Sequence, residues 1–176
     1  MKTSIALIGF MGTGKTVVGK VLARKLGKKF IELDAVIEKK AGKSIPEIFS
    51  RDGEIRFREL EIEAVRDVAA KKNTIIACGG GIVLNTINID RLKKESVIIC
   101  LMASPSVILK RTSPDKDNRP LLNVADREQQ VKKLLEFRRH FYTRAADITI
   151  NTSRLDIASV ADKILETLKN DESYHR

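Results

Sequence analysis

The chain has 176 residues, and 43% of them are hydrophobic, so it can form one substantial core and gives little reason to expect two domains. Its 33 Lys and Arg residues exceed its 23 Asp and Glu residues, and the resulting net charge of +10 favours anionic partners. Only two Tyr and six Phe are available for base stacking, and the basic residues are spread along the chain, which argues against nucleic-acid binding as the main role. No segment approaches the roughly 18 apolar residues that a membrane-spanning helix needs.

The first predicted element is an apolar strand at residues 3–8, which leads directly into the segment GFMGTGKT. This segment fills every fixed position of the phosphate-loop pattern G-x-x-x-x-G-K-[ST], with Gly9, Gly14, Lys15 and Thr16. Glycines allow such a loop to turn its backbone N–H groups toward a diphosphate, and the helix that follows directs its free amides at the same anion. We expect Lys15 to reach the β- and γ-phosphates of a nucleotide and the Thr16 hydroxyl to bind Mg²⁺. The expected nucleotide contacts are Gly12, Thr13, Gly14, Lys15, Thr16 and Val17.

Strand and helix patterns alternate along the remainder of the chain. Strands are predicted at residues 3–8, 29–33, 74–78, 96–101 and 148–150. Helices are predicted at residues 15–26, 34–40, 54–71, 87–93, 105–111, 126–144 and 158–168, and a capping box at Ser44 and Glu47 opens one more. Five strands with helices between them predict an α/β fold in which a parallel sheet is covered on both faces, giving three layers. We expect one domain over residues 1–170 and a frayed tail at residues 171–176.

Two features follow strand ends, where ligands bind in such sheets. Asp34 follows the second strand, and its carboxylate could accept a proton from an attacking hydroxyl or orient that hydroxyl. Capping the next helix is the simpler role for Asp34, and the two roles are compatible. The triplet Gly79–Gly81 follows the third strand. It permits a backbone to lie against a bound molecule, although a tight turn explains it equally well.

Four arginines leave a choice between surface charge and anion binding. Arg58 lies in GEIRFRELE among glutamates that can pair with it at helical spacing. Arg138 and Arg139 lie in a basic helix. Arg119 lies in the polar segment 112–126, which is either a mobile lid over an active site or an ordinary surface loop.

The two cysteines indicate a reduced compartment. Cys78 and Cys100 each lie in an apolar, β-branched run, where a cysteine is more often a small buried hydrophobic residue than a disulfide partner or a nucleophile. The apolar stretch after Lys2 runs straight into the phosphate loop without a cleavage-type site, so it is not read as a secretory signal. We therefore expect a cytoplasmic protein.

Several segments together resemble one family. GFMGTGKT, FIELDAVIE, GEIRFRELE, GGG, RPLL and RRHFY followed by AD occur in this order from about residue 5 to about residue 154, and this combination closely resembles the shikimate kinases. The resemblance implies a P-loop NTPase fold of the nucleoside-monophosphate-kinase type, with substrate-binding helices at about 34–64 and a lid at about 112–126. It also implies transfer of phosphate from ATP, with Mg²⁺, to the 3-hydroxyl of shikimate, on the route to chorismate and the aromatic amino acids.

The resemblance assigns roles to individual residues. It implies that Lys15 stabilises the transferred charge, that Asp34 holds the substrate hydroxyls, and that Arg58 and Arg138 clamp the substrate carboxylate. The remaining assignments are substrate contacts from Gly79, Gly80 and Gly81, a phosphate contact from the lid residue Arg119, and an adenine-side contact from Arg154. The expected protein is a monomer that binds shikimate and ATP and neither nucleic acid nor membranes.

One position departs from the family pattern, which has Asp-x-Asp where this chain has Glu32-Leu33-Asp34. Glu32 replaces an aspartate that helps to hold magnesium through water, and it could do so with one fewer bridging water or with the ion displaced. Two other functions would share the phosphate loop. A kinase for gluconate or a nucleoside monophosphate would not need Asp34, Arg58 and Arg138 as a set. A nucleotide-gated binding module would instead use its basic surface to contact nucleic acid or a protein.

Overall fold

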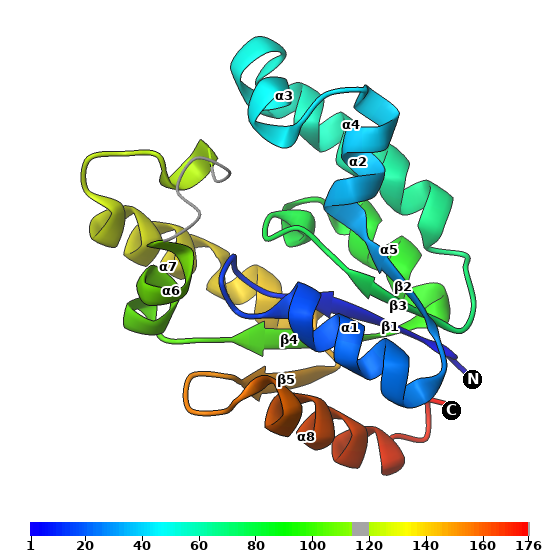
Figure 1. Cartoon of the computed structure of the whole chain (residues 1–176). Helices are drawn as coiled ribbons and strands as arrows, with labels where there is room; N and C mark the ends of the chain where they lie inside the picture. The colour runs from blue at the N-terminus through cyan, green and yellow to red at the C-terminus, as the bar shows by residue number, and fades with distance from the viewer. Residues whose placement is uncertain (114–119, 176) are drawn as a thin grey trace.

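The computed structural model describes residues 1–113 and 120–175. Within them, five strands form one sheet in the order β2-β3-β1-β4-β5, and every neighbouring pair is parallel. The strands are β1 (Ser4–Ile8), β2 (Lys29–Glu32), β3 (Thr74–Ala77), β4 (Ser96–Met102) and β5 (Ile148–Asn151). The predicted α/β fold with a five-stranded parallel sheet is confirmed (Figure 1).

Helices connect the strands and cover both faces of the sheet (Figure 1). The α-helices are α1 (Lys15–Leu26), α2 (Leu33–Ala41), α3 (Ile45–Arg51), α4 (Gly53–Val68), α5 (Thr86–Glu95), α6 (Pro105–Thr112), α7 (Arg127–Ala145) and α8 (Ile157–Lys169). The short 3-10 helices η1 (Ile82–Leu84) and η3 (Pro120–Leu122) lie after β3 and before α7. In the described part of the chain, no helix has the length and apolarity needed to cross a membrane.

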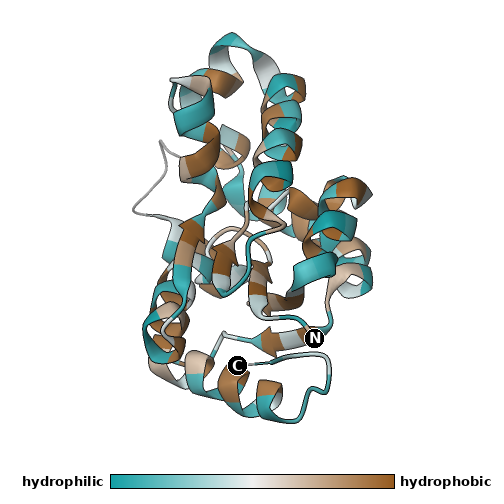
Figure 2. Ribbon diagram, turned by 90° about the vertical axis from the view of Figure 1, so that its right-hand side faces the viewer, coloured by the Kyte–Doolittle hydropathy of each residue, from teal (hydrophilic) through white to brown (hydrophobic). Residues whose placement is uncertain are grey.

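The side chains of β1 alternate between two apolar layers. Ile5 and Leu7 pack in a cluster with α1 and α8. Ala6 and Ile8 lie in the opposite cluster, to which α2, α3, α4, α5 and α7 contribute. Figure 2 shows the hydrophobic residues concentrated on the strands and on the inner faces of the helices. A strand that is covered on both faces buries all of its side chains, which accounts for the apolar run from Ile5 to Ile8 in β1.

Local sequence signals set the course of the chain from α2 to α4. α2 ends at Gly42, which has the left-handed φ of 62° that favours glycine at a helix end. α3 begins with a capping box in which Ser44 and Glu47 each accept a hydrogen bond from the other's backbone N–H. The Glu38 carboxylate accepts a hydrogen bond from the Ile45 N–H at 2.9 Å, which ties α2 to α3. The helices α2, α3 and α4 therefore stand together at one end of the sheet (Figure 1).

Most predicted element boundaries differ from the observed ones by one to three residues, and two of these differences have a clear physical reason. α2 begins at Leu33 with Glu32 in the N-cap position, so Asp34 lies in the first turn of α2 and the suggested N-cap role of Asp34 is wrong. The physical reason is that β2 is short, because its pairing with β3 ends at Glu32. α4 ends at Val68 instead of Lys71, since the chain turns sharply there to enter β3 and the Lys71 N–H bonds the Val68 carbonyl oxygen.

The prediction of a frayed tail at residues 171–176 is wrong for the part that is described. Tyr174 is 8% exposed and packs in the cluster with α1 and α8. It forms a parallel bridge with Lys2, and the His175 N–H donates to the Lys2 carbonyl oxygen at 2.8 Å. The ammonium group of Lys28 lies 5.2 Å from the centre of the Tyr174 ring. Backbone pairing with Lys2 and burial of the Tyr174 ring together hold the tail, so the two chain ends are adjacent (Figures 1 and 2).

The segment expected to be a lid, residues 112–126, is described in part. Pro120–Leu122 forms η3, and Leu122 is buried in the cluster beneath α7. Residues 114–119 lie outside the described residues, and with them Arg119.

Candidate active site

The loop between β1 and α1 has the shape that the phosphate-loop pattern predicts. Gly9, Gly12 and Gly14 have φ values of 136°, 79° and 98°, which L side chains rarely adopt. A Cβ atom on Gly9 would collide with the Leu101 carbonyl oxygen, and one on Gly12 would lie 2.8 Å from Cγ2 of Thr112. Gly14 caps α1, so the first amides of that helix open toward the loop. Backbone N–H groups and a helix N-terminus therefore converge into an anion-binding site.

Two polar side chains at the start of α1 belong to this loop. Lys15 Nζ donates to the carbonyl oxygens of Gly9 at 2.8 Å and Phe10 at 2.9 Å. Thr16 Oγ1 donates to Glu32 Oε1 at 2.7 Å, which joins α1 to the end of β2. Among the described residues, no group of three or more His, Cys, Asp or Glu side chains is arranged to hold a metal ion. A cation beside Thr16 and Glu32 would therefore take its other ligands from phosphate or water.

A cavity of about 750 Å³, called here the larger cavity, opens beside the phosphate loop. The predicted site residues that line it are Gly12, Gly14, Lys15, Thr16, Val17, Glu32, Asp34, Gly79 and Gly80. The predicted contact Thr13 is buried instead, with its hydroxyl donating to the Phe10 carbonyl oxygen at 2.7 Å. Arg111, which the sequence did not single out, also lines this cavity. Its Nη1 donates to the Gly12 carbonyl oxygen at 3.4 Å and to Thr152 Oγ1 at 3.1 Å.

A second cavity of about 120 Å³, called here the smaller cavity, adjoins the first. The predicted substrate-binding residues that line it are Asp34, Arg58, Gly79, Gly80, Gly81 and Arg138. The two cavities share the lining residues Met11, Asp34, Ile45, Gly79 and Gly80. The structure thus brings together every residue predicted to bind substrate, and Asp34 lies at the boundary with the phosphate loop.

Arg138 carries a buried positive charge into the smaller cavity. The residue is 2% exposed, and among the described residues its Nε and Nη1 atoms have no hydrogen-bond acceptor. Its guanidinium carbon lies 5.7 Å from the centre of the Phe10 ring. Burying a guanidinium group with unsatisfied N–H donors costs several kcal/mol, so a bound anion that accepts from them would stabilise this arrangement. A carboxylate matches the two parallel N–H groups of a guanidinium.

Arg58 forms ion pairs at helical spacing and also lines the smaller cavity. Its Nη2 lies 2.7 Å from Glu54 Oε1 at helical spacing, and its Nη1 lies 3.5 Å from Glu61 Oε2. The side chain is 14% exposed, and it also lines the smaller cavity. A Cβ atom on Gly81 would overlap the Arg58 guanidinium, so this close approach requires glycine.

Glu61 is a residue of the smaller cavity that sequence reasoning missed. It is 0% exposed on α4, one turn after Arg58. Burial raises the pKa of the Glu61 carboxyl to about 7; the positive charge of Arg58 opposes this shift, and the negative charge of Asp34 adds to it. The sequence does place Glu61 three residues after Arg58, a spacing at which the two side chains can pair on a helix. The same spacing fits a solvent-exposed ion pair equally well, so it does not indicate burial.

We expect Glu61→Gln to remove a pH-dependent contribution to the stability of the fold. The pKa of Glu61 rises from its ordinary 4.5 to about 7 on folding, so its contribution is fully present below about pH 4.5 and is lost as the pH rises toward 7. Urea denaturation should therefore show the Gln variant gaining stability relative to wild type from about pH 5 to about pH 8. Glu63→Gln, on the same helix but in contact with solvent, is the control. A difference between wild type and the Glu61 variant that stays constant with pH would contradict this interpretation.

Three arginines considered in the sequence analysis do not line either of these two cavities among the described residues. Arg154 is exposed on the turn after β5 and lines neither cavity. Arg139 is exposed on α7 and lines a different cavity, beside Lys132. Arg119 lies outside the described residues.

Comparison with known proteins identifies the family. A family model described as Shikimate kinase matches residues 11–169. A protein of Thermodesulfovibrio yellowstonii named Shikimate kinase is 50% identical over 163 residues, which cover 93% of each chain. A solved structure of shikimate kinase from Acinetobacter baumannii in complex with shikimate is 37% identical, has a TM-score of 0.93 and matches 98% of this chain and 96% of that one.

A gluconokinase structure from Sinorhizobium meliloti shares the fold at 16% identity, with a TM-score of 0.60, over 97% of this chain and 94% of that one. At this level of identity the likeness concerns the fold alone. The family model instead matches residues 11–169, which include the phosphate-loop residues from Met11 onward and all six predicted substrate-binding residues, and the 50% identity extends over 93% of the chain. The chain belongs to the shikimate kinase family.

Proposed function

We propose that this protein transfers the γ-phosphoryl group of ATP to the 3-hydroxyl of shikimate, giving shikimate 3-phosphate and ADP on the route to chorismate. The observation that carries the proposal is the buried guanidinium of Arg138, without an acceptor on Nε and Nη1 among the described residues, in a cavity that opens to the phosphate loop. Membership of the shikimate kinase family and the related structure that holds shikimate support the same substrate.

The carboxylate of shikimate would bind between Arg58 and Arg138. Both guanidinium groups line the smaller cavity, and Gly80 and Gly81 lie against them. Two guanidinium groups suit a planar carboxylate because each offers parallel N–H donors. The carboxylate would also accept hydrogen bonds from the buried Arg138 guanidinium and so offset the free-energy cost of burying its charge.

Asp34 would orient the attacking hydroxyl and accept its proton. Its position in the first turn of α2 places the carboxylate where the two cavities meet. In the reaction, the hydroxyl oxygen forms a bond to the γ-phosphorus, the bond from that phosphorus to the β–γ bridging oxygen breaks, and the hydroxyl proton passes to Asp34. Lys15 and the loop amides would stabilise the negative charge on the transferred group.

The nucleotide would occupy the larger cavity with its phosphates on the loop residues Gly12 to Val17. Arg111 is positioned beside it, because it lines this cavity and bonds the Gly12 carbonyl oxygen. Arg154 would contact the adenine side of the nucleotide. Thr152 in the same turn donates a hydrogen bond to the Thr13 carbonyl oxygen at 3.2 Å, which joins this turn to the phosphate loop. Arg119 remains our prediction for a phosphate contact.

Mg²⁺ fits the oxygens that Thr16 and Glu32 present. A hydroxyl oxygen and a carboxylate oxygen 2.7 Å apart are ligands of the hard type that this ion prefers. When bound, Mg²⁺ would offset phosphate charge beside Lys15. We also propose that the protein is cytoplasmic. We propose further that it acts as a monomer, since one chain supplies the described lining of both cavities.

The proposal is tested by measuring ADP release with shikimate, gluconate and nucleoside monophosphates as acceptors. We expect saturable turnover with shikimate and at most trace turnover with the others, because gluconate has no ring and nucleoside monophosphates have no carboxylate, whereas shikimate combines a carboxylate with ring hydroxyls. Faster turnover with gluconate or a nucleoside monophosphate would contradict the proposal. Salt-sensitive oligonucleotide binding without any phosphorylated product would instead favour the binding module.

A further inference from the structure

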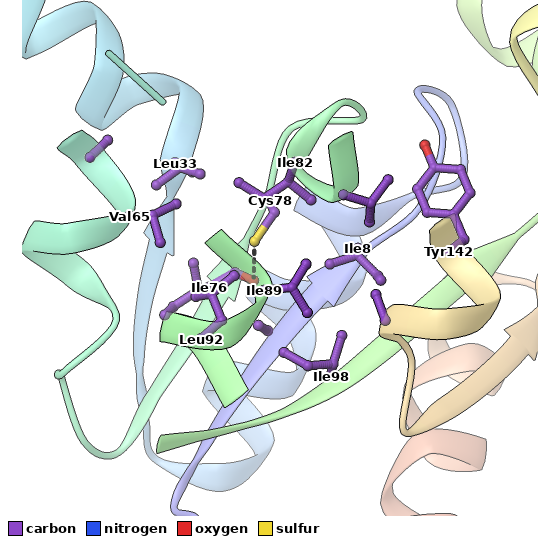
Figure 3. Close-up of a cluster of buried hydrophobic side chains, with 14 of the residues drawn as sticks. Ile8, Leu33, Val65, Ile76, Cys78, Ile82, Ile89, Leu92, Ile98 and Tyr142 are labelled. Atoms are coloured by element: carbon purple, nitrogen blue, oxygen red, sulfur yellow. Dashed lines mark hydrogen bonds between the residues drawn. The ribbon is translucent and has the colours of Figure 1, made fainter. Parts of the chain in front are cut away.

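Tyr142 links α7 to the glycine triplet of the substrate site. It is 4% exposed, and its hydroxyl donates to the Gly80 carbonyl oxygen at 2.5 Å across 62 positions of sequence. Figure 3 shows the Tyr142 ring standing on α7 beside Ile8, with the hydroxyl directed away from the helix. Tyr142 is the last residue of the RRHFY segment, but no role could be assigned to it from the sequence, because its contact with Gly80 joins segments that are distant in sequence.

The hydrogen bond from Tyr142 to Gly80 reaches the stretch of backbone against which Arg58 and Arg138 lie. A Cβ atom on Gly80 would lie 3.7 Å from Arg138 Nη1, and one on Gly81 would overlap the Arg58 guanidinium. The triplet is therefore the wall against which both guanidinium groups lie. Glycine has more backbone freedom than any other residue, so three in succession need outside support to keep one conformation.

The Tyr142 hydroxyl supplies such support at the centre of the triplet. The carbonyl oxygen and the N–H of a trans peptide point in opposite directions, so the bond to the Gly80 oxygen also fixes the direction of the Gly81 N–H. The neighbouring bonds, from Ile82 N to the Gly79 oxygen and from Leu84 N to the Gly81 oxygen, leave the Gly80 oxygen to Tyr142. Burial raises the pKa of the Tyr142 phenol, so the hydroxyl stays protonated as a donor at physiological pH.

One side of the buried Tyr142 ring borders a cavity. A third cavity of about 440 Å³, between the end of β4 and α7, is bordered by Tyr142 together with Phe10 and Leu135. A ring with open space on one side can shift when its hydrogen bond is removed, because fewer neighbouring atoms resist the movement. The hydroxyl bond thus matters more here than it would in a fully packed core.

We infer that Tyr142 is a positioning residue that acts through Gly80 to hold Arg58 and Arg138 in the arrangement that binds the substrate carboxylate. This inference rests on the proposed function, since it concerns the acid-binding half of the same site. It does not place Tyr142 in contact with substrate or nucleotide. Loss of the hydroxyl therefore affects recognition of the acid and leaves nucleotide binding unchanged.

The test is Tyr142→Phe, which keeps the ring and removes the hydroxyl. We expect the KM for shikimate to rise about 3- to 10-fold, the range that the loss of one hydrogen bond gives, with little change in kcat or in the KM for ATP. The preference for shikimate over its carboxamide analogue should fall by a similar factor. In an Arg138→Met background the same substitution should have a much smaller effect, because the group that Tyr142 positions is then absent.

Ser4→Ala is the matched control. Ser4 Oγ is a buried hydroxyl that donates to the Lys71 carbonyl oxygen at 2.9 Å. It lies at the end of β1 that is far from the phosphate loop, so its removal deletes a buried hydrogen bond that only supports the fold. It should lower the melting temperature without changing the KM for shikimate. An unchanged KM for shikimate in folded Tyr142→Phe, or an equal rise in the KM for ATP, would overturn the inference. Failure of the wild-type protein to phosphorylate shikimate would count against the proposed function instead.

Discussion

Asp34→Asn is expected to lower kcat with shikimate by about 10²- to 10⁴-fold, the range that a positioned general base contributes. The amide keeps the size of the side chain but cannot accept the hydroxyl proton. Asp34 is the carboxylate that lines both cavities in the first turn of α2, so its loss removes the group closest to the meeting point of acceptor and nucleotide. Steady-state kinetics with saturating ATP measures the effect.

The fold and the nucleotide site should survive this substitution. We expect the circular dichroism spectrum and the KM for ATP to stay near those of wild type, since Asp34 is not part of the phosphate loop. Asp52→Asn is the matched control, because Asp52 is exposed before α4 and pairs with Lys43 at 2.8 Å, away from both cavities. Turnover retained by Asp34→Asn within tenfold of wild type would refute the assignment of Asp34 as the base.

Arg138→Met is expected to raise the KM for shikimate by about 10- to 100-fold while leaving the KM for ATP near normal. The magnitude follows from hydrogen bonds to charged groups, which contribute about 1.5–3 kcal/mol each. The same variant should melt at the wild-type temperature or above it when no ligand is present. Arg138 is buried without an acceptor on Nε and Nη1 among the described residues, and replacing such a charge with an apolar side chain of similar length removes a desolvation cost.

Arg139→Met serves as the control for Arg138→Met. Arg139 is the next residue on α7, it is exposed, and it lines a different cavity, so the variant should keep wild-type values of both KM parameters. Arg138→Met should weaken shikimate binding and leave the melting temperature equal or higher. A residue that merely supported the fold would instead lower the melting temperature when it is replaced. Equal loss of shikimate and ATP affinity, or a large drop in melting temperature, would contradict the carboxylate clamp.

The fold could be predicted because its signals are local and mutually consistent. The apolar run of β1 fits a strand that is buried on both faces, and Gly27 ends α1 with a φ of 63°. The phosphate loop was equally readable, since its glycines occupy positive φ values that other residues rarely adopt. The parallel sheet and the family are both as predicted, so the strand, helix-end and loop signals in the sequence all indicate the same fold.

The features that escaped prediction depend on contacts between distant segments. Tyr174 looked like part of a tail, but it is held by pairing with Lys2 at the other end of the chain. Arg111 reaches the phosphate loop from α6, and Glu61 is buried only because α4 packs under the glycine triplet. A helical pattern gives the face on which a side chain lies but not what that face meets.

Identification of the reaction product tests the central claim most directly. The protein is incubated with ATP, Mg²⁺ and shikimate, and the product is examined by ³¹P and two-dimensional ¹H–¹³C NMR. If Arg58 and Arg138 hold the carboxylate while Asp34 presents one alcohol to the phosphate loop, a single product forms, with phosphate on the oxygen of carbon 3. Phosphate on another hydroxyl, a mixture of positions, or ATP consumption without a shikimate phosphate would contradict that arrangement.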